Sequence, residues 1–332
     1  MGWPSVSFEP IRIHTINSGS TDILIIGVDG QLAWVDGNTL EQKTQPKAPF
    51  PARIILSAIT EKALVACWLN RDLLISRMAS IDLSQEFHEG LSQQKIRNFA
   101  TAGSGDVQVK GANWSHILDA ECLAIDVDDT GIIFSLWNRG IYRIKHDTSE
   151  LWRKPEIKWT EMGTIEEAKI PAKIVIIGEE VHIWSRAGER AILNKETGDL
   201  IDFKVAKLEI SVDRIFCENI SSKNETHWLV VSDENTAYWI KEIEGEENIV
   251  SAGLRGPIND AKFDIRSKSW RITGWREDIM WNSQEIIYED TKEVGVSLYC
   301  LSGKWMVLNN RGDWVPFTIG NKLRTHSSSE EE

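Results

Sequence analysis

Apolar and polar positions along the chain form a repeating pattern of short strands separated by tight turns. The clearest copy is residues 23–36, ILIIGVDGQLAWVD, in which an apolar run meets a turn and a second run carries a tryptophan. Short apolar runs bounded by turn residues are typical of buried strands. Similar segments recur to the C-terminus and give seven candidate turns, near Gly30, Arg71, Gly140, Glu180, Asn235, Glu277 and Gly312.

The spacing of these turns predicts a β-propeller. Between Gly30 and Gly312 the mean repeat is about 47 residues. Propeller blades have a period of about 40–50 residues, so this spacing is typical of a propeller. Asp29-Gly30 and two Asn-Arg-Gly turns supply residues that tolerate positive φ. We therefore predict an all-β fold, a single seven-bladed β-propeller over residues 1–320, with six or eight blades as alternatives.

The position of each strand within its blade is predicted from how apolar the strand is. Residues 23–26, 174–177 and 228–231 are almost entirely apolar, which is typical of strands buried on both faces, and we expect them to be inner strands. The runs after the turns alternate more and predict half-buried middle strands. Polar outer strands are predicted at residues 200–205 and 285–289.

The two ends of the chain are predicted to close the ring. Residues 5–16 have spare strand character, and the last blade lacks an outer strand. Pairing the N-terminal strand with the C-terminal blade would remove both exposed edges. Residues 321–332, which end in SSSEEE, predict a disordered acidic tail.

This repeat resembles the β-propeller superfamily, in the manner of WD40-like and PQQ-like proteins, over nearly the whole chain. The Gly-His and Trp-Asp signatures of WD40 blades are absent, so the resemblance rests on strand pattern and period and implies the fold alone. The alanine- and glycine-containing repeat of PQQ-dependent dehydrogenases is also absent. We therefore expect no cofactor.

The longest interval between turns contains an insertion, residues 80–112. Leu83, Phe87 and Leu91 are spaced by four, which predicts a short amphipathic helix within residues 82–99. This element could pack over a blade edge or a channel mouth. Alternatively, it could bind a partner through Phe87 and Leu91.

Composition narrows the classes of partner and compartment. The net charge of −13 repels phosphate backbones, so we expect no nucleic-acid partner. No apolar run is long enough to span a bilayer, and the N-terminus lacks the pattern of a signal peptide. The four cysteines lie in apolar runs without CxxC spacing, which predicts reduced thiols in a cytoplasmic protein. The 15 tryptophans either fill gaps between sheets or form platforms for sugars or partners.

Candidate metal chemistry is confined to one short stretch. Asp126 and Asp128, in DVDDTG, resemble the start of a calcium loop, but the twelfth position is Trp137 instead of a bidentate glutamate. The competing interpretation is an aspartate-rich hairpin turn. We therefore expect no metal, with Asp126 and Asp128 as a weak candidate pair.

Candidate catalytic groups are carboxylates without a motif. Asp213, Asp260 and Asp264 lie near predicted blade starts, where side chains can point at a central channel. Glycosidases need two carboxylates across a pocket, and a chain with 50 acidic residues supplies many pairs by chance. No nucleophile elbow, phosphate loop or dinucleotide fingerprint occurs.

Arginine recurs in the turns. Four arginines each follow a predicted inner strand: Arg71, Arg139, Arg276 and Arg311. If all blades have the same orientation, these equivalent turns lie on one rim of the ring. They could pair with carboxylates of neighbouring blades, or they could form a positive rim suited to acidic peptides.

These features predict a non-catalytic scaffold for protein interactions that binds a protein partner through its rim or top face. We expect a monomer or a subunit of a complex. The alternative is a propeller enzyme, or a binder of carbohydrates or small molecules, that uses channel carboxylates and exposed tryptophans.

Overall fold

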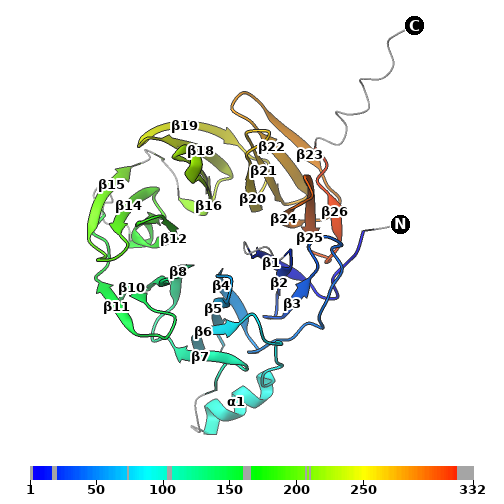
Figure 1. Ribbon diagram of the computed structural model, residues 1–332, viewed down its shortest axis with the longest axis vertical. Coiled ribbons are helices and arrows are strands. Elements are labelled where there is room, and N and C mark those ends of the chain that lie inside the picture. The colour runs from blue at the N-terminus through cyan, green and yellow to red at the C-terminus, as the bar shows by residue number, and fades with distance from the viewer. Residues whose placement is uncertain are drawn as a thin grey trace.

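A computed structural model shows seven β-sheets arranged as blades around a central channel, which confirms the predicted seven-bladed β-propeller (Figure 1). It describes residues 3–16, 21–72, 75–102, 107–159, 166–205, 208 and 211–319. The predicted acidic tail, residues 321–332, lies outside these residues. Within each blade the strands pair antiparallel, and their order in the sheet follows their order in the chain.

Each blade begins with its innermost strand, next to the channel (Figure 1). Blade 1 contains β1 (Pro10–Thr15), β2 (Ile23–Gly27) and β3 (Leu32–Val35). Blade 2 contains β4 (Arg53–Ile59), β5 (Ala63–Asn70), β6 (Ile75–Asp82) and β7 (Ala112–Ile117), with helix α1 (Gln93–Ala102) before β7. Blade 3 contains β8 (Cys122–Asp128), β9 (Gly131–Leu136), β10 (Gly140–Ile144) and β11 (Glu150–Lys154).

The remaining blades follow the same plan. Blade 4 contains β12 (Pro171–Ile177), β13 (Glu180–Ser185), β14 (Glu189–Asn194) and β15 (Leu200–Val205), after the short helix η1 (Glu166–Lys169). Blade 5 contains β16 (Val212–Ile220), η2 (Ser221–Lys223), β17 (Glu225–Ser232), β18 (Thr236–Ile243) and β19 (Glu246–Gly253). Blade 6 contains β20 (Ile258–Asp264), β21 (Ser269–Gly274), β22 (Glu277–Trp281) and β23 (Ile286–Asp290). Blade 7 contains β24 (Gly295–Leu301), β25 (Lys304–Asn309) and β26 (Trp314–Pro316).

The N-terminal segment completes blade 7. Ser5 forms a β-bridge with Asp313, and the Val6 amide donates to the Gly312 carbonyl oxygen at 2.8 Å. Val6 is buried beside Trp314 in the cluster shared by blades 1 and 7. The chain ends therefore close the ring as predicted, because the N-terminal segment covers the edge of β26.

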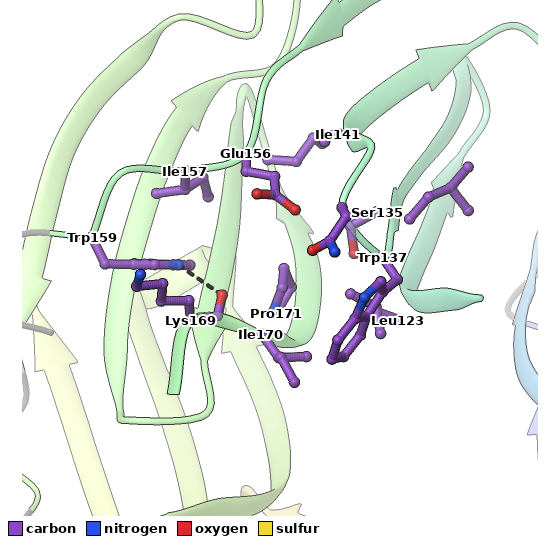
Figure 2. Close-up of a pocket in the computed structure, with 13 residues that line it drawn as sticks. Leu123, Ser135, Trp137, Ile141, Glu156, Ile157, Trp159, Lys169, Ile170 and Pro171 are labelled. Atoms are coloured by element: carbon purple, nitrogen blue, oxygen red, sulfur yellow. Dashed lines mark hydrogen bonds between the residues drawn. The ribbon is translucent and has the colours of Figure 1, made fainter. Parts of the chain in front are cut away.

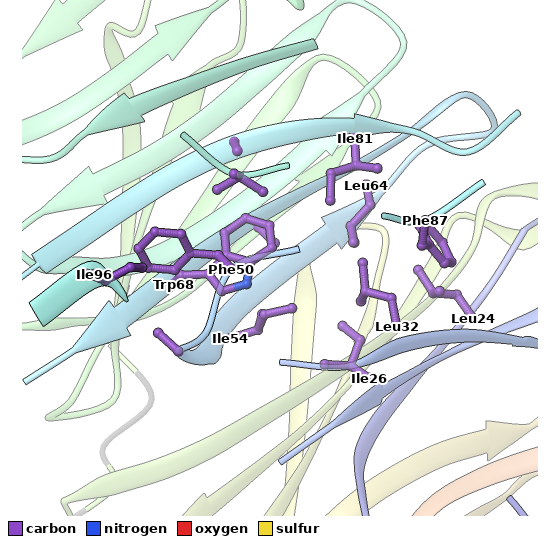
Figure 3. Close-up of a cluster of buried hydrophobic side chains, with 14 residues drawn as sticks. Leu24, Ile26, Leu32, Phe50, Ile54, Leu64, Trp68, Ile81, Phe87 and Ile96 are labelled. Atoms are coloured by element: carbon purple, nitrogen blue, oxygen red, sulfur yellow. The ribbon is translucent and has the colours of Figure 1, made fainter. Parts of the chain in front are cut away.

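The core consists of apolar clusters that each join two neighbouring blades, one cluster at every blade interface. Figure 3 shows the cluster of blades 1 and 2, where Phe50, Trp68 and Ile96 pack together. Five tryptophans are completely buried in these layers, which supports the structural interpretation for them: Trp68, Trp184, Trp228, Trp270 and Trp314. Large indoles fill the wedge-shaped space between radially arranged sheets.

All seven innermost strands share one irregularity near their first residue. Each has a register shift against its second strand at the same point, for example between Pro10 and Arg12 in β1 and between Val212 and Arg214 in β16. A β-bulge bends the strand and re-aims the side chain that follows it. The bulges therefore recur at one mouth of the channel.

The prediction of inner strands was wrong in two of three cases. Residues 23–26 and 228–231 lie in β2 and β17, which are second strands, whereas residues 174–177 lie in the inner strand β12. A second strand has a neighbour on each edge and a blade on each face, so it is the most apolar. The innermost strand borders the channel and carries charged residues instead. The predicted outer strands agree with β15 and β23.

The turn near Glu180 also differs from the other six, because it joins the first and second strands of blade 4. The corresponding turn of that blade begins at Arg186.

The predicted helix lies at the wrong place in the insertion. The chain forms turns and extended structure after β6, and α1 begins at Gln93. The Gly90 amide donates to the Ala48 carbonyl oxygen at 2.8 Å, and a Cβ at this glycine would clash with the Pro49 carbonyl oxygen. This contact with another segment prevents an earlier helix. Of the described helices, none has the length and apolar character of a membrane span.

Candidate functional site

One end of the ring gathers the turns that follow the second strand of each blade and the connections that enter the inner strands. We call it the turn face. In six blades, the amide after the second strand donates to the carbonyl oxygen just before the inner strand: Val28 to Glu9, Trp137 to Glu121, Arg186 to Ile170, Asp233 to Ser211, Trp275 to Pro257 and Asn310 to Val294. Since the blades share one orientation around the ring, these turns lie on one face.

The predicted arginines follow second strands, not inner strands, and lie on this face. Arg71 in blade 2 approaches Glu121 at 3.6 Å, and Arg139 in blade 3 approaches Asp119 at 3.0 Å. Both carboxylates belong to the connection between β7 and β8. The two pairs therefore link adjacent blades through one loop, although exposed pairs of this kind contribute only about 0–1 kcal/mol each.

The other two arginines differ from each other. Arg311 approaches Glu293 at 3.0 Å, again pairing a turn with the connection to an inner strand. Arg276 has no carboxylate within ion-pair distance in the described part of the chain, and its guanidinium lies 5.9 Å from the Trp275 ring centroid. Three of the four charges are thus matched locally, and only Arg276 retains an unpaired charge toward solvent.

The two apolar residues predicted to bind a partner have different positions. Phe87 is buried and stacks on Trp34 with 5.8 Å between ring centroids, so it belongs to the core of blades 1 and 2. Phe87 therefore stabilises the core and does not present its ring to a partner. Leu91 is exposed in the segment before α1.

A pocket on the turn face, between blades 3 and 4, was not predicted from the sequence. It has a volume of about 230 Å³ and is mainly apolar, with Leu123, Ile157, Trp159 and Pro171 among its walls. Figure 2 shows Trp137 at one side of this pocket and Trp159 at the other. The Trp159 indole N–H donates to the Lys169 carbonyl oxygen at 2.9 Å, which fixes that wall.

Trp137 is 42% exposed although it is one of the largest apolar side chains. Trp275 occupies the equivalent position in blade 6 and is 62% exposed. A turn position normally favours small or polar residues. The sequence signal was therefore a tryptophan directly before a turn arginine or asparagine, in WNRG and WREDI.

The channel opens on the turn face through a second cavity of about 850 Å³. Four arginines line it. Arg12 in β1, Arg53 in β4 and Arg214 in β16 come from inner strands, and Arg71, paired with Glu121, comes from the turn after β5. Arg12 donates to the Ser57 hydroxyl at 2.9 Å and to the Ile55 carbonyl oxygen at 3.5 Å. Burial, and then the charge of Arg214, lower the pKa of Arg12.

Deeper in the channel, Lys173 and His14 are surrounded by protein. Burial lowers the pKa of Lys173, opposed by Asp126 and reinforced by Arg12 and Lys262. Burial lowers the pKa of His14 to about 3, with Arg12, Lys262 and Lys173 adding to the effect. His14 Nε2 lies 2.7 Å from the Ser57 hydroxyl. His14 is therefore neutral at pH 7, in a setting of several cations.

The channel carboxylates are held by the backbone. Asp126 accepts from the amides of Val127 and Ile176 at 3.0 and 2.8 Å. Asp260 accepts from Ala261 and Leu298 at 2.9 and 2.8 Å. Burial raises the pKa of both carboxyl groups. Both oxygens of each group are engaged, so these carboxylates brace neighbouring inner strands.

The weak metal candidate is not a preformed ligand set. Asp128 accepts from the amides of Thr130 and Gly131 in a hairpin turn, while Asp126 reaches the opposite way to β12. Within the described ranges, no three histidine, cysteine, aspartate or glutamate side chains gather in a metal-binding geometry. Of the other predicted carboxylates, Asp213 lines the channel mouth, and Asp264 accepts from Ser267 and Trp305 away from it.

Comparison with known proteins supports the fold and goes no further. No family model and no curated protein matches the chain. The β-propeller domain of Cps50 (Swd1) from Myceliophteria thermophila is 10% identical with a TM-score of 0.64, covering 93% of this chain and 96% of that one. BamB from Moraxella catarrhalis is 11% identical with a TM-score of 0.55, over 90% and 82%. BBS1N, solved in complex with ARL6DN, is 13% identical with a TM-score of 0.57, over 96% and 94%.

Proposed function

We propose that this protein is a non-catalytic scaffold that binds a protein partner on the turn face. The observation that carries the proposal is the exposed Trp137 at the side of an apolar pocket. A rigid ring holds this pocket between two blades, so a partner would bind a surface that is already formed. Preformed pockets lined by aromatic residues are where single contacts dominate binding energy.

The chemistry of the pocket favours a segment that inserts one apolar or aromatic side chain. Leu123, Ile157 and Pro171 would contact that side chain, and Trp137 would cover it. Glu156 and Lys169 also line the pocket and would orient the polar backbone of the segment. An acidic residue of the partner would be favoured at Arg276, which among the four predicted turn arginines is the one without a carboxylate within ion-pair distance in the described chain.

Two further observations support the proposal. BBS1N, a propeller of similar fold, was solved in complex with ARL6DN, which shows that a ring of this shape can bind a protein. All four cysteines are free, which suits a reducing compartment such as the cytoplasm. We propose the cytoplasm as the site of action on that ground.

The test compares two tryptophans of equal exposure. Trp137→Ala removes the pocket side wall, whereas Trp3→Ala removes a 41% exposed tryptophan at the N-terminal segment. The tagged full-length chain is used to capture and identify partners, and the affinity of each purified partner is then measured by calorimetry. We expect Trp137→Ala to weaken binding at least about tenfold, since hot-spot side chains contribute about 2 kcal/mol or more. Trp3→Ala should leave the affinity unchanged.

Equal affinity of the wild type and Trp137→Ala for every purified partner would contradict the pocket proposal. Recovery of the chain alone, from extracts at low and moderate salt, would contradict the scaffold itself.

A further inference from the structure

The channel mouth concentrates positive charge in a protein whose net charge is −13. Arg12, Arg53 and Arg214 come from blades 1, 2 and 5, so three separate inner strands bring guanidinium groups to one cavity. Each is near the start of its strand, where the bulges occur. Like charges repel, so the fold has brought them together against an electrostatic cost.

Local carboxylates match these cations only in part. Arg53 has no carboxylate within ion-pair distance among the described residues. Arg214 is 3.5 Å from Asp213 through its Nε, which leaves its two terminal nitrogens for another acceptor. Arg12 uses two of its five N–H donors in the contacts with Ser57 and Ile55. Of the other acids on the mouth, Asp72 lies 4.0 Å from Arg97, and Glu9 is at the outer margin of β1.

The cationic character continues below the mouth. Lys173 in β12 and Lys262 in β20 both act on His14, which places the three side chains within electrostatic range of one another. Neither lysine has a carboxylate within ion-pair distance in the described chain. The nearby Asp126 and Asp260 direct their oxygens to backbone amides instead.

We propose that the channel mouth binds a small multivalent phosphate-bearing anion, with Arg12, Arg53 and Arg214 as its direct donors and Lys173 and Lys262 supplying charge from below. Guanidinium groups bind phosphate oxygens in bidentate geometry, and three of them around one cavity match the several oxygens of a polyphosphate. A cavity of about 850 Å³ lies within the size range of small-molecule sites.

The size and depth of the site select a small ligand. The blades surround the cavity laterally and it opens at the turn face, so it fits a compact anion better than a duplex nucleic acid. The acidic exterior would repel such a polymer as well. A compact anion that enters from the turn face meets four arginines against three carboxylates, those of Glu9, Asp72 and Asp213, on a protein that is acidic as a whole.

The test uses the full-length chain with tripolyphosphate, inorganic phosphate and citrate as probes, measured by calorimetry and thermal unfolding. Two double variants carry the same change in charge. Arg53→Gln with Arg214→Gln alters the mouth, and Arg139→Gln with Arg311→Gln alters the turn face outside it. We expect tripolyphosphate to bind the wild type more tightly than phosphate or citrate. The mouth variant should bind it at least about tenfold more weakly, which is the scale of one charged hydrogen bond, and the control variant within about twofold of wild type.

Each other outcome overturns the proposal. Absence of tripolyphosphate binding at millimolar concentration removes the site. Equal loss in both double variants shows general attraction to surface charge. Citrate binding as tight as tripolyphosphate binding removes the preference for phosphate. The folding of both variants is checked by their unfolding temperature without ligand. Because the substituted side chains are exposed, we expect this temperature to fall by no more than about a few degrees.

Discussion

At the scale of single residues, the ring solves a problem of buried charge in blades 4 and 5. Arg190 is completely buried, lies over the rings of Trp184 and Trp228 at 5.2 and 4.9 Å, and contacts Glu242 at 2.9 Å. A buried cation is tolerated only when it is paired. His182 lies beside this cluster, 5.6 Å from the Trp228 ring, and the Arg190 charge reaches it.

His182 should make the protein sensitive to acid. Burial, and then Arg190, lower its pKa in the folded state to about 3, from a usual value of about 6.5. Between these values the unfolded chain binds a proton that the folded chain does not, so stability falls as the pH is lowered from about 6.5 toward 3. We expect His182→Phe to flatten the dependence by up to about 1.4 kcal/mol per pH unit, measured by urea unfolding at several pH values. Parallel curves for the two proteins would refute this role.

At the scale of elements, α1 depends on the ring for its structure. It has ten residues, and Ile96 is the one side chain of its described residues that is buried, against Phe50 and Trp68 (Figure 3). Ser92 precedes the helix, and its carbonyl oxygen accepts the Ile96 amide at 3.1 Å. A helix this short is marginal in water without tertiary packing.

Ile96→Asp should therefore undock α1 while the blades stay folded. A charge placed among apolar side chains is expected to lower the local stability by on the order of several kcal/mol. Hydrogen exchange followed by mass spectrometry should show lost protection at residues 93–102 and retained protection in β5 and β6. The control is Gln94→Asp, on the exposed side of the helix, which should retain protection in α1. Loss of protection throughout blade 2 would show instead that α1 is part of the core.

At the scale of the whole molecule, stability depends on closing the ring. Each blade packs on two neighbours, so an open interface would expose an apolar layer. The closing contact is short, since only the segment around Ser5 and Val6 pairs with Asp313 and its neighbours. We therefore expect the closure to contribute more to stability than its length indicates.

Val6→Asp tests the closure. Its side chain is buried against Trp314, whereas that of the neighbouring Ser5 is exposed, so Ser5→Asp introduces the same charge on the same segment as a control. We expect Val6→Asp to lower the free energy of unfolding by about 2–4 kcal/mol, measured by denaturant unfolding, and Ser5→Asp by less than about 1 kcal/mol. Equal effects would mean that the N-terminal segment does not hold the ring closed.

The sequence by itself indicated the repeated hairpins and favoured seven blades, with six or eight left open, although the turn near Glu180 joins a different pair of strands from the other six. These follow from local rules, because apolar runs bounded by glycine and asparagine turns specify hairpins with little help from distant residues. The repetition of those hairpins then made a closed ring the way to bury every apolar face. The sequence also predicted that the turn arginines lie on one rim, since they occupy equivalent turns of the repeat.

Only the tertiary structure decided what the charged and aromatic side chains do. Arg12, Arg53 and Arg214 meet at one cavity because blades 1, 2 and 5 surround the same channel, and no local pattern links them. Phe87 is buried and α1 begins late because Gly90 packs on a segment some 40 residues earlier in the chain, at Ala48. Such contacts between residues far apart in the sequence form only when the whole ring has closed. The sequence therefore predicted the propeller fold, whereas the pocket and the channel mouth are formed only when the blades assemble.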